Sequence, residues 1–307
     1  MPPSELLAPG RDEVRSYGGQ VDLGAVEAVS GANGGLGYSF MATLVSFHAH
    51  PDDESITAGG LLRRAADQGH RVVLVFGTRG ELGEVEDGFL DEGEPLWRRR
   101  VAETLESARI LGAARTEFLG YVDSGMMGEP SNDDPNCFWR APVEDAAVRL
   151  AALIRDEQAD VLTVYDDNGG YGHPDHIQVH RVGLRAAELA GTGRVYQLTT
   201  NREYFERGWE QFRASADAAG IDIPASDTPD VEMGKREAEI PARFDVSGQL
   251  EAKRASMRAH ASQIAEHSLF LAMPDEAFAY GFGVEWAIRD GQGPGITETD
   301  PMAGLPV

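Results

Sequence analysis

Two short clusters of histidine and aspartate carry the strongest chemical signal in this sequence. The first, HAHPDDE, follows the apolar run LVSF at residues 44–47 and places His50 and Asp53 three positions apart. Pro51 lies between them and restricts the backbone φ angle. Both side chains can therefore reach one point from a single loop or first helical turn. A histidine and a carboxylate arranged in this way suit a divalent metal, and zinc in particular.

The second cluster, GYGHPDH at residues 170–176, follows another apolar run and supplies a third ligand, His176. Together with His50 and Asp53, it would leave a divalent ion an open position for water. A zinc site of this composition can lower the pKa of its bound water to about 7. We therefore predict a catalytic Zn²⁺ site, in which Fe²⁺ is an alternative because it accepts similar ligands.

Residues beside these ligands are candidates for proton transfer. Asp52 precedes Asp53 and need not bind the metal, so we predict that it is the general base that accepts a proton from water. His173 lies three positions before His176. In its protonated form, His173 could stabilise an oxyanion and then donate a proton to a leaving amine.

Two residues of the second cluster have two interpretations each. Asp175 either orients His173, as carboxylates behind a functional histidine do, or caps the helix that follows. Tyr171 either donates a hydrogen bond to the oxyanion or packs as a loop aromatic. Far along the chain, His260 in the segment MRAHASQI is a candidate for the wall of the site.

The elements that position these clusters alternate between strands and helices. Buried strands are predicted at residues 43–48, 72–77, 116–121, 161–165 and 195–199. Helical patterns lie between them or follow, at residues 55–68, 96–111, 143–157 and 175–190. This alternation predicts an α/β fold with a Rossmann-like, mostly parallel sheet and helices on both faces. Because ligands bind beyond the carboxyl ends of such strands, the active site is expected at that edge of the sheet.

The ends of the chain differ from this regular middle. Residues 1–40 are rich in glycine and show no sustained period, so we predict a flexible extension, with Met41 as an alternative start. Residues 41–290 are expected to form a single domain, in which residues 201–290 elaborate the substrate side. The last residues, 291–307, are predicted to be a flexible tail.

Beyond residue 200, the pattern predicts fewer regular elements. Helices are expected at residues 201–219 and 248–267, and the segment 222–247 between them contains proline and aspartate and is expected to be irregular.

Composition excludes several classes of protein. The 307 residues carry 51 acidic and 27 basic side chains, a formal charge of −24, which disfavours nucleic acid and anionic membranes as partners. The single cysteine, Cys137, excludes an internal disulfide and fits a reducing compartment. There is no apolar run of about 18 residues and no secretory signal pattern. These features predict a cytoplasmic protein that acts on a small molecule.

At this point the two clusters carry a family resemblance. AHPDDE after the first strand and YDDNGGYGHPDH after a later one resemble the LmbE-like zinc deacetylases, which include the PIG-L de-N-acetylases and the mycothiol-pathway enzymes. The resemblance covers residues 43–200. It implies that His50, Asp53 and His176 are the zinc ligands. It also implies that Asp52 is the general base and that His173, with Asp175 as its partner, is the catalytic histidine.

The same resemblance bears on the substrate. Arg100 in WRRRVAE and Asp123 in YVDSGM are similar to positions that contact the sugar–inositol substrate of the GlcNAc-inositol deacetylase. The motifs GYVDSGM and YDDNGGYGHPDH both resemble two mycothiol-pathway enzymes, the GlcNAc-inositol deacetylase and the mycothiol S-conjugate amidase. The amidase has a lysine at the position of Thr57 and the deacetylase a serine, so a hydroxyl residue favours the deacetylase.

The leading hypothesis is therefore a zinc-dependent hydrolase that removes an N-acetyl group from a GlcNAc-inositol-like substrate. The alternative within enzymes is a mycothiol S-conjugate amidase or another small-molecule amide hydrolase. A nucleotide-binding Rossmann domain is a different class, but GxGxxG is missing after Phe47. A catalytically inactive relative is a third class, which the complete set of polar site residues disfavours.

Overall fold

The computed structural model describes residues 42–218, 233–289, 291–293 and 295–305. The extension predicted at residues 1–40 lies outside these ranges, as do Met41 and part of the segment predicted to be irregular.

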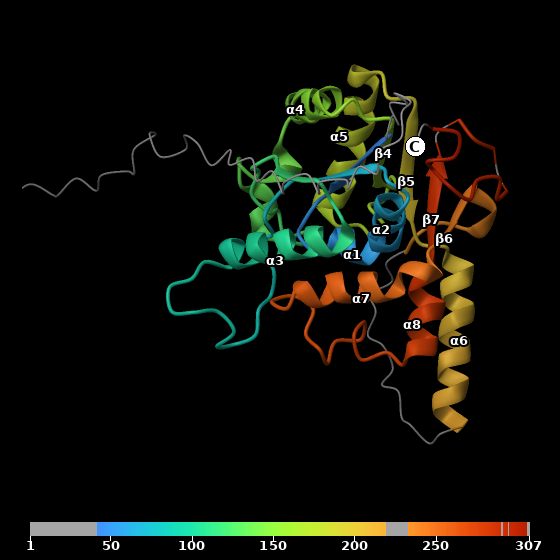
Figure 1. Ribbon diagram of the computed structural model, residues 1–307. Helices are drawn as coiled ribbons and strands as arrows, with labels where there is room; N and C mark the ends of the chain where they lie inside the picture. The colour runs from blue at the N-terminus through green and yellow to red at the C-terminus, as the bar shows by residue number, and fades with distance from the viewer. Residues whose placement is uncertain (1–41, 219–232, 290, 294, 306–307) are drawn as a thin grey trace, which may run out of the picture.

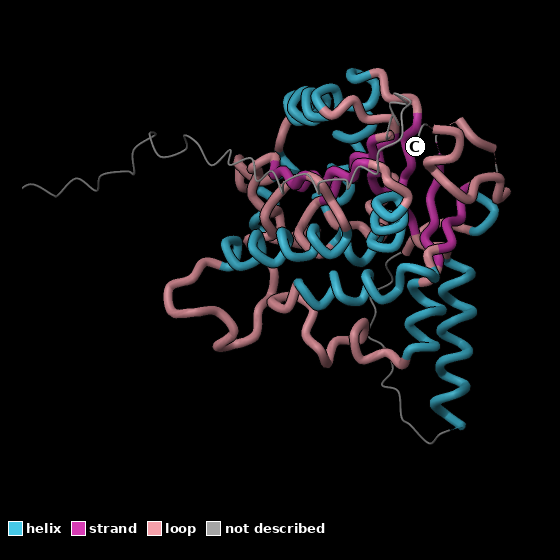
Figure 2. The backbone as a smooth tube through the Cα atoms, in the orientation of Figure 1, coloured by secondary structure: helices cyan, strands magenta, loops and turns pink. Residues whose placement is uncertain are grey.

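Within the described residues, seven strands form one sheet, drawn in magenta in Figure 2. They are β1 (Thr43–His48), β2 (Arg71–Phe76), β3 (Arg115–Phe118), β4 (Val161–Tyr165), β5 (Arg194–Thr199), β6 (Ala242–Asp245) and β7 (Val284–Arg289). Their spatial order is β3-β2-β1-β4-β5-β7-β6. The strands β1 to β5 are parallel, and β7 is antiparallel to both β5 and β6. The predicted mostly parallel sheet is confirmed.

The described residues also form α-helices on both faces of the sheet, as predicted. They are α1 (Asp53–Thr57), α2 (Gly59–Asp67), α3 (Leu96–Leu111), α4 (Val143–Asp156), α5 (Pro174–Ala190), α6 (Arg202–Ala218), α7 (Leu250–Ala259) and α8 (Asp275–Phe282). Figure 1 shows α4 and α5 above the sheet and α2 and α3 below it, with α7 packed along α3. None of the helices that the structure describes is long and apolar enough to cross a membrane.

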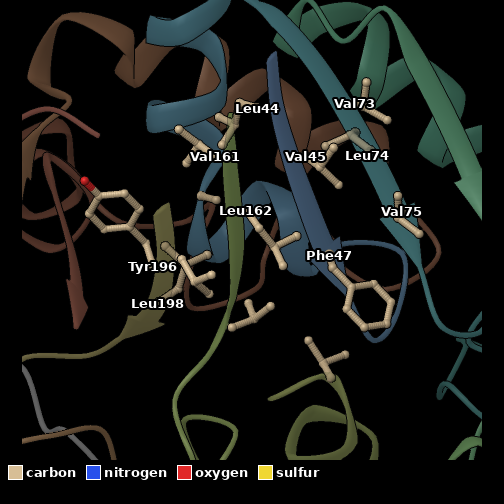
Figure 3. Packing of buried hydrophobic residues seen from close by; sticks show 14 of the residues in the cluster. Leu44, Val45, Phe47, Val73, Leu74, Val75, Val161, Leu162, Tyr196 and Leu198 are labelled. Carbon is tan, nitrogen blue, oxygen red and sulfur yellow. The ribbon is translucent and has the colours of Figure 1, made fainter. Parts of the chain in front are cut away.

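The central strands are apolar because helices cover both of their faces. Every residue of β1 and β4 is buried, and Val45 of β1 pairs with Val73 of β2 and with Leu162 of β4. Figure 3 shows these side chains with Phe47 and Leu74 in one apolar cluster. This packing fixes the strand ends from which the two clusters depart.

The strand order reverses between β1 and β4. From β1 the chain continues to β2 and β3 on one side, while β4 and β5 lie on the other. In α/β sheets a crevice forms at such a reversal, beyond the carboxyl ends of the strands. HAHPDDE follows β1 and GYGHPDH follows β4, so the two clusters leave neighbouring strands at this crevice.

The helix predicted at residues 55–68 is in fact two helices, α1 and α2, separated at Ala58. The break exposes the first amides of α2, and those of Gly60 and Leu61 donate to the carboxylate of Glu285 at 2.8 and 2.9 Å. Negative charge is favourable at a helix N-terminus. A side chain from β7, more than 200 residues away, therefore determines where α2 begins.

Other differences lie in the C-terminal third. The helix predicted at residues 248–267 ends at Ala259, where His260 leaves helical geometry with ψ 47°. The segment predicted to be irregular contains β6, and neither α8 nor β7 was predicted. The four residues of β6 pair with β7, and pairing of this kind leaves little local pattern in the sequence.

The described part of the predicted flexible tail, residues 291–293 and 295–305, contacts the sheet. The backbone carbonyl of Glu298 accepts a hydrogen bond from Arg243 N at 2.9 Å, and its carboxylate accepts one from the Tyr196 hydroxyl at 2.5 Å. Met302 is buried against the main core. These residues therefore pack against β5 and β6, which the prediction of a flexible tail did not anticipate.

Candidate active site

The predicted metal ligands converge at the carboxyl end of β1 and β4. His50 follows β1, Asp53 begins α1 and His176 lies in the first turn of α5. One carboxylate oxygen of Asp53 lies 3.5 Å from His50 Nδ1, and the other lies 3.4 Å from His176 Nε2. All three residues are buried. The structure thus brings the predicted set together, with Asp53 between the two rings.

The surroundings offer more donor atoms than one ion needs. Among the described residues, two groups have ligand atoms within 4.8 Å of one another, namely His50 with His173 and His176, and His50 with Asp123 and Asp175. His50 belongs to both groups, and Asp53 to neither. The cluster therefore can hold a metal ion, while the choice of His50, Asp53 and His176 as ligands remains a prediction.

His176 has the form that a metal ligand requires. Its Nδ1 donates to the carbonyl oxygen of Gly169 at 3.1 Å, so in the neutral ring Nε2 carries the lone pair. That Nε2 atom is buried and has no hydrogen-bond partner among the described residues. A buried nitrogen without a partner is costly, and a metal ion beside Asp53 would satisfy it. Backbone carbonyls commonly fix ligating histidines in this way.

His50 is surrounded by carboxylates. Its Nε2 donates to Asp175 Oδ2 at 3.1 Å and lies 3.5 Å from Asp123 Oδ1, while Nδ1 faces Asp53. Burial opposes protonation, but these three carboxylates raise the pKa of His50 well above its usual value. A cation bound at Nδ1 would displace that proton, as metal binding to histidine generally does.

Asp52 has an unusual backbone. Its φ angle is 101°, and among the described non-glycine residues only Gln158 also has positive φ. Asp52 occupies the N-cap position of α1, yet its side chain makes no capping hydrogen bond. The carboxylate instead accepts from Arg100 Nη2 at 3.2 Å. Strained conformations of this kind concentrate at functional sites.

Burial also tunes the Asp52 carboxyl. Desolvation raises its pKa to about 6, although the Arg100 guanidinium acts in the opposite direction. A carboxylate in this range is largely ionised at neutral pH and can still hold a proton, as a general base must. The position and the pKa both suit the predicted role, which the structure leaves as a prediction.

His173 differs from the prediction in its protonation. It caps α5, and its Nδ1 accepts a hydrogen bond from the backbone amide of Asp175 at 3.1 Å. Nδ1 must therefore be unprotonated, which leaves the proton of the neutral ring on Nε2. Burial, together with His50 and His176, lowers the pKa of His173 to about 3. The resting ring is neutral, not the imidazolium that the sequence suggested.

The Asp175 carboxylate does not contact His173, contrary to one interpretation of the sequence. It accepts hydrogen bonds from the backbone amide of Ser124 at 2.9 Å and from the Ser124 hydroxyl, and it accepts from His50. The capping interpretation also fails, because His173 itself caps the helix. Asp175 therefore orients a predicted metal ligand.

The remaining predicted residues line the same region. Arg100 is buried, and its guanidinium donates to Gly80 O at 2.9 Å, to the carbonyl of Pro51 and to Asp52. Asp123 lies beside His50, as described above. Tyr171 places its ring 4.9 Å from that of His176, centroid to centroid, and remains 37% exposed. Contacts of Arg100, Asp123 and Tyr171 with substrate stay predictions.

Sequence reasoning missed Glu54 and did not assign a partner to His260. Both are completely buried, and His260 Nε2 lies 2.6 Å from Glu54 Oε1. The Glu54 side chain also accepts from the backbone amide of Asp52 at 3.0 Å. The signal that could have identified Glu54 is its place in the charged run DDE directly after His50 and Pro51.

A buried histidine and aspartate cluster, with a carboxyl of raised pKa beside it, defines a candidate metal-dependent hydrolase at the switch point of an α/β sheet. Comparison with known proteins agrees with this class. The family described as PIG-L, GlcNAc-PI de-N-acetylase, matches residues 45–187.

Relatives extend the match to most of the chain. A 1D-myo-inositol 2-acetamido-2-deoxy-α-D-glucopyranoside deacetylase of Salinispora arenicola is 40% identical over 286 residues, which is 86% of this chain and 92% of the relative. A protein of the same name from Acidothermus cellulolyticus is 39% identical over 257 residues, covering 80% and 88%. The chain belongs to the PIG-L family and is an N-deacetylase of that family, a hydrolase.

Solved structures show the same fold. The A40926 pseudoaglycone deacetylase superposes with a TM-score of 0.52 at 15% identity, covering 80% of this chain and 96% of that one. A deacetylase of the teicoplanin pathway gives 0.51 at 15% identity, covering 82% and 100%.

Proposed function

We propose that this protein hydrolyses the acetamide of 1D-myo-inositol 2-acetamido-2-deoxy-α-D-glucopyranoside, the GlcNAc-inositol named for its relatives. The observation that supports this most directly is the meeting of His50, Asp53 and His176, with the Asp52 carboxyl close enough for the Asp53 charge to act on it. The identity of about 40% across most of both chains supports the particular substrate. The partner is then a small amino-sugar molecule, and a cytoplasmic location stays a prediction.

We propose Zn²⁺ as the cofactor, held by His50, Asp53 and His176. The donor set of two imidazoles and one carboxylate fits zinc, and Fe²⁺ is the alternative. The unpartnered Nε2 of His176 and the ionised Asp53 carboxylate support a cation at this place. When bound, zinc would polarise the acetyl carbonyl and make water more acidic.

The residues of the chain then have separate roles. The Asp52 carboxylate, oriented by Arg100, accepts a proton from the attacking water. The Nε2–H group of neutral His173 donates a hydrogen bond to the oxygen that gains negative charge. Because His173 has no second proton to give, the proton held by Asp52 passes to the leaving amine. Tyr171 keeps its hydroxyl proton, because partial burial and Asp53 raise its pKa, and it can donate a second hydrogen bond.

Metal content and acetate release test this proposal together. Purified protein is expected to contain one zinc or iron ion per chain and to release acetate from GlcNAc-inositol in a reaction that chelation abolishes and zinc restores. Turnover of a mycothiol S-conjugate, measured in parallel, would favour the amidase alternative. Protein without metal, and without activity after metal addition, would contradict the proposal.

Two substitutions separate the roles of the site residues. Asp52→Asn is expected to keep the metal and to lose roughly 10²- to 10⁴-fold in kcat, the usual contribution of a general base. His176→Ala is expected to lose both metal and activity. Full activity of Asp52→Asn would remove Asp52 from the mechanism, and a full metal load in His176→Ala would remove His176 from the ligands.

A further inference from the structure

The carboxylate of Glu54 is fully buried and accepts four hydrogen bonds. Oε1 accepts from Ser55 Oγ at 3.0 Å, from Ser107 Oγ at 2.5 Å and from His260 Nε2 at 2.6 Å. Oε2 accepts from the backbone amide of Asp52 at 3.0 Å. None of these four hydrogen bonds comes from a predicted metal ligand. The Glu54 carboxylate and its partners therefore form a separate network beside the site.

The network joins three parts of the chain that are distant in sequence. Ser107 lies in α3, and His260 ends α7, which packs along both α3 and α1. His260 is completely buried, and within the part of the chain that the structure describes its Nδ1 atom has no hydrogen-bond partner. An unsatisfied buried nitrogen is unfavourable. The ring is held through its other nitrogen, Nε2, which donates to Glu54 at 2.6 Å.

Asp52 needs such an external support. Its φ angle of 101° lies in a region that residues with side chains rarely adopt. An aspartate at an N-cap usually accepts from the amides of the first turn, but this one makes no capping bond and turns toward Arg100. The Asp52 carbonyl accepts from the amides of Ser55 and Ile56 at 3.0 and 3.1 Å, as the start of a helix requires. The Asp52 amide donates to Glu54 Oε2, and this bond holds the other side of the same residue from a side chain.

We infer that Glu54, fixed by Ser107 and His260, is the positioning residue that holds Asp52 in its strained conformation. The inference rests on the proposed role of Asp52 as the base. A base acts only when it is held in the right geometry, and a displacement of about 1 Å can cost 10²-fold in rate. Glu54 is assigned this function through Asp52 and not through contact with substrate.

A double-mutant cycle between Glu54 and Asp52 tests the inference. In Glu54→Gln, a single amide oxygen can accept from either the Asp52 amide or the His260 ring, but not from both. We expect kcat to fall roughly ten- to hundredfold, with unchanged KM and full metal content. In the Asp52→Asn background the same change is expected to cost almost nothing, because the group that Glu54 positions is already inactive.

Glu103→Gln is the matched control. Glu103 is also a buried acid and accepts from the backbone amide and hydroxyl of Ser262 at 2.9 and 2.6 Å, so it links α3 to the segment after α7 without touching Asp52. Its kcat is expected to stay at the wild-type level. If Glu54→Gln fails to fold, Ser107→Ala removes one hydrogen bond and enters the same cycle, with a smaller loss expected.

The outcomes distinguish the two proposals. If Asp52→Asn alone is fully active, the proposed base is wrong. If Asp52→Asn is inactive as proposed but Glu54→Gln lowers the residual rate by the same factor in both backgrounds, Glu54 acts independently of Asp52 and the inference is overturned. A loss in Glu103→Gln equal to that in Glu54→Gln would likewise show a general packing effect.

Discussion

In each histidine of the site, the protein fixes one ring nitrogen and leaves the other for chemistry. His176 donates through Nδ1 to Gly169, His50 donates through Nε2 to Asp175, and His173 accepts at Nδ1 from a backbone amide. The nitrogens left for chemistry are then Nε2 of His176 and Nδ1 of neutral His50, which each carry a lone pair, and Nε2 of His173, which carries a proton. Two rings can therefore act as metal ligands and one as a hydrogen-bond donor. The group that bonds the other nitrogen of each ring decides which role that histidine has.

Gly169 is the residue on which the orientation of His176 depends most closely. Its φ angle is +61°, and a Cβ atom there would lie 2.4 Å from His176 Cβ. Gly169→Ala is therefore expected to displace the ring and to weaken zinc binding by roughly tenfold or more, the usual effect of disturbing a partner of a metal ligand. Competition with a chromophoric chelator measures this affinity.

Gly170→Ala provides the control for that prediction. Gly170 also has positive φ, +81°, but a Cβ atom there would meet nothing within 4 Å. Both variants should lose about 1–2 kcal/mol of stability, because alanine is disfavoured at positive φ, and Gly169→Ala should lose more because its Cβ would also meet the backbone of His176. Only Gly169→Ala should lose zinc affinity, and equal affinities in the two variants would contradict the argument.

At the scale of elements, the sequence predicts those whose signal is local. The strands β1, β2, β4 and β5 are visible as apolar runs because helices bury them on both faces, and α3 was predicted with its observed bounds. The break at Ala58 was not visible, because it depends on Glu285, which lies over 200 residues away.

The same distinction applies to the site. Residues that sit in short motifs, such as His50 and Asp53, could be predicted because their spacing itself suggests a function. Partners that arrive from elsewhere could not. Asp175 was paired with its sequence neighbour His173, whereas the fold brings it to His50, 125 residues away. His260 was a candidate without a partner because Glu54 lies 206 residues from it.

The C-terminus of α4 carries an acid where the helix dipole disfavours one. Glu157 occupies the C-cap, and its side chain accepts from Arg71 Nε and Arg115 Nη1, both at 2.6 Å. Burial acts in the opposite direction, but these arginines hold the pKa of Glu157 below its ordinary value. The two arginines come from β2 and β3, so this network ties one end of α4 to the sheet edge.

A depressed pKa means that ionised Glu157 stabilises the fold above its unfolded pKa and that this stability is lost as pH falls. Glu157→Gln is therefore expected to lower the free energy of unfolding by up to about 1 kcal/mol at pH 7, a value discounted for partial solvent exposure. The difference from wild type should shrink below about pH 4.3, the ordinary value for glutamate. Urea unfolding at pH 7 and near pH 4 measures it.

The quantity compared is the difference in free energy of unfolding between wild type and Glu157→Gln. The metal site contributes equally to both proteins, because its ligands are protonated in acid in both, and so it cancels. Glu188→Gln is the control, because Glu188 pairs with Arg185 on α5 with 68% of its side chain exposed. It should change stability little at either pH. A Glu157→Gln effect that stays constant down to pH 4 would show that charge is not its origin.

At the scale of the whole molecule, a buried ion pair lies where the C-terminal third meets helix α2. Lys253 of α7 donates to Glu285 of β7 at 2.6 Å, and their side chains are 1% and 3% exposed. Glu285 also caps α2 through Gly60 and Leu61. The pair therefore lies where α7, β7 and α2 meet. We expect these parts to unfold as one unit.

Lys253→Met tests that expectation, because it keeps the length of the side chain and leaves Glu285 buried without its cation. Breaking a buried pair in this way costs about 3–5 kcal/mol, so the urea midpoint should fall strongly. Because Glu285 still accepts from Gly60 and Leu61 and β7 still pairs with β5 in this variant, tryptophan fluorescence and far-ultraviolet circular dichroism should still report one coincident transition. Arg258→Met, which removes a pair with Glu266 on the exposed side of α7, should cost less than about 1 kcal/mol. If Lys253→Met unfolds in two separate steps, the contacts of Glu285 with α2 and of β7 with β5 do not hold the two parts together without the pair, and the expectation of a single unit is wrong.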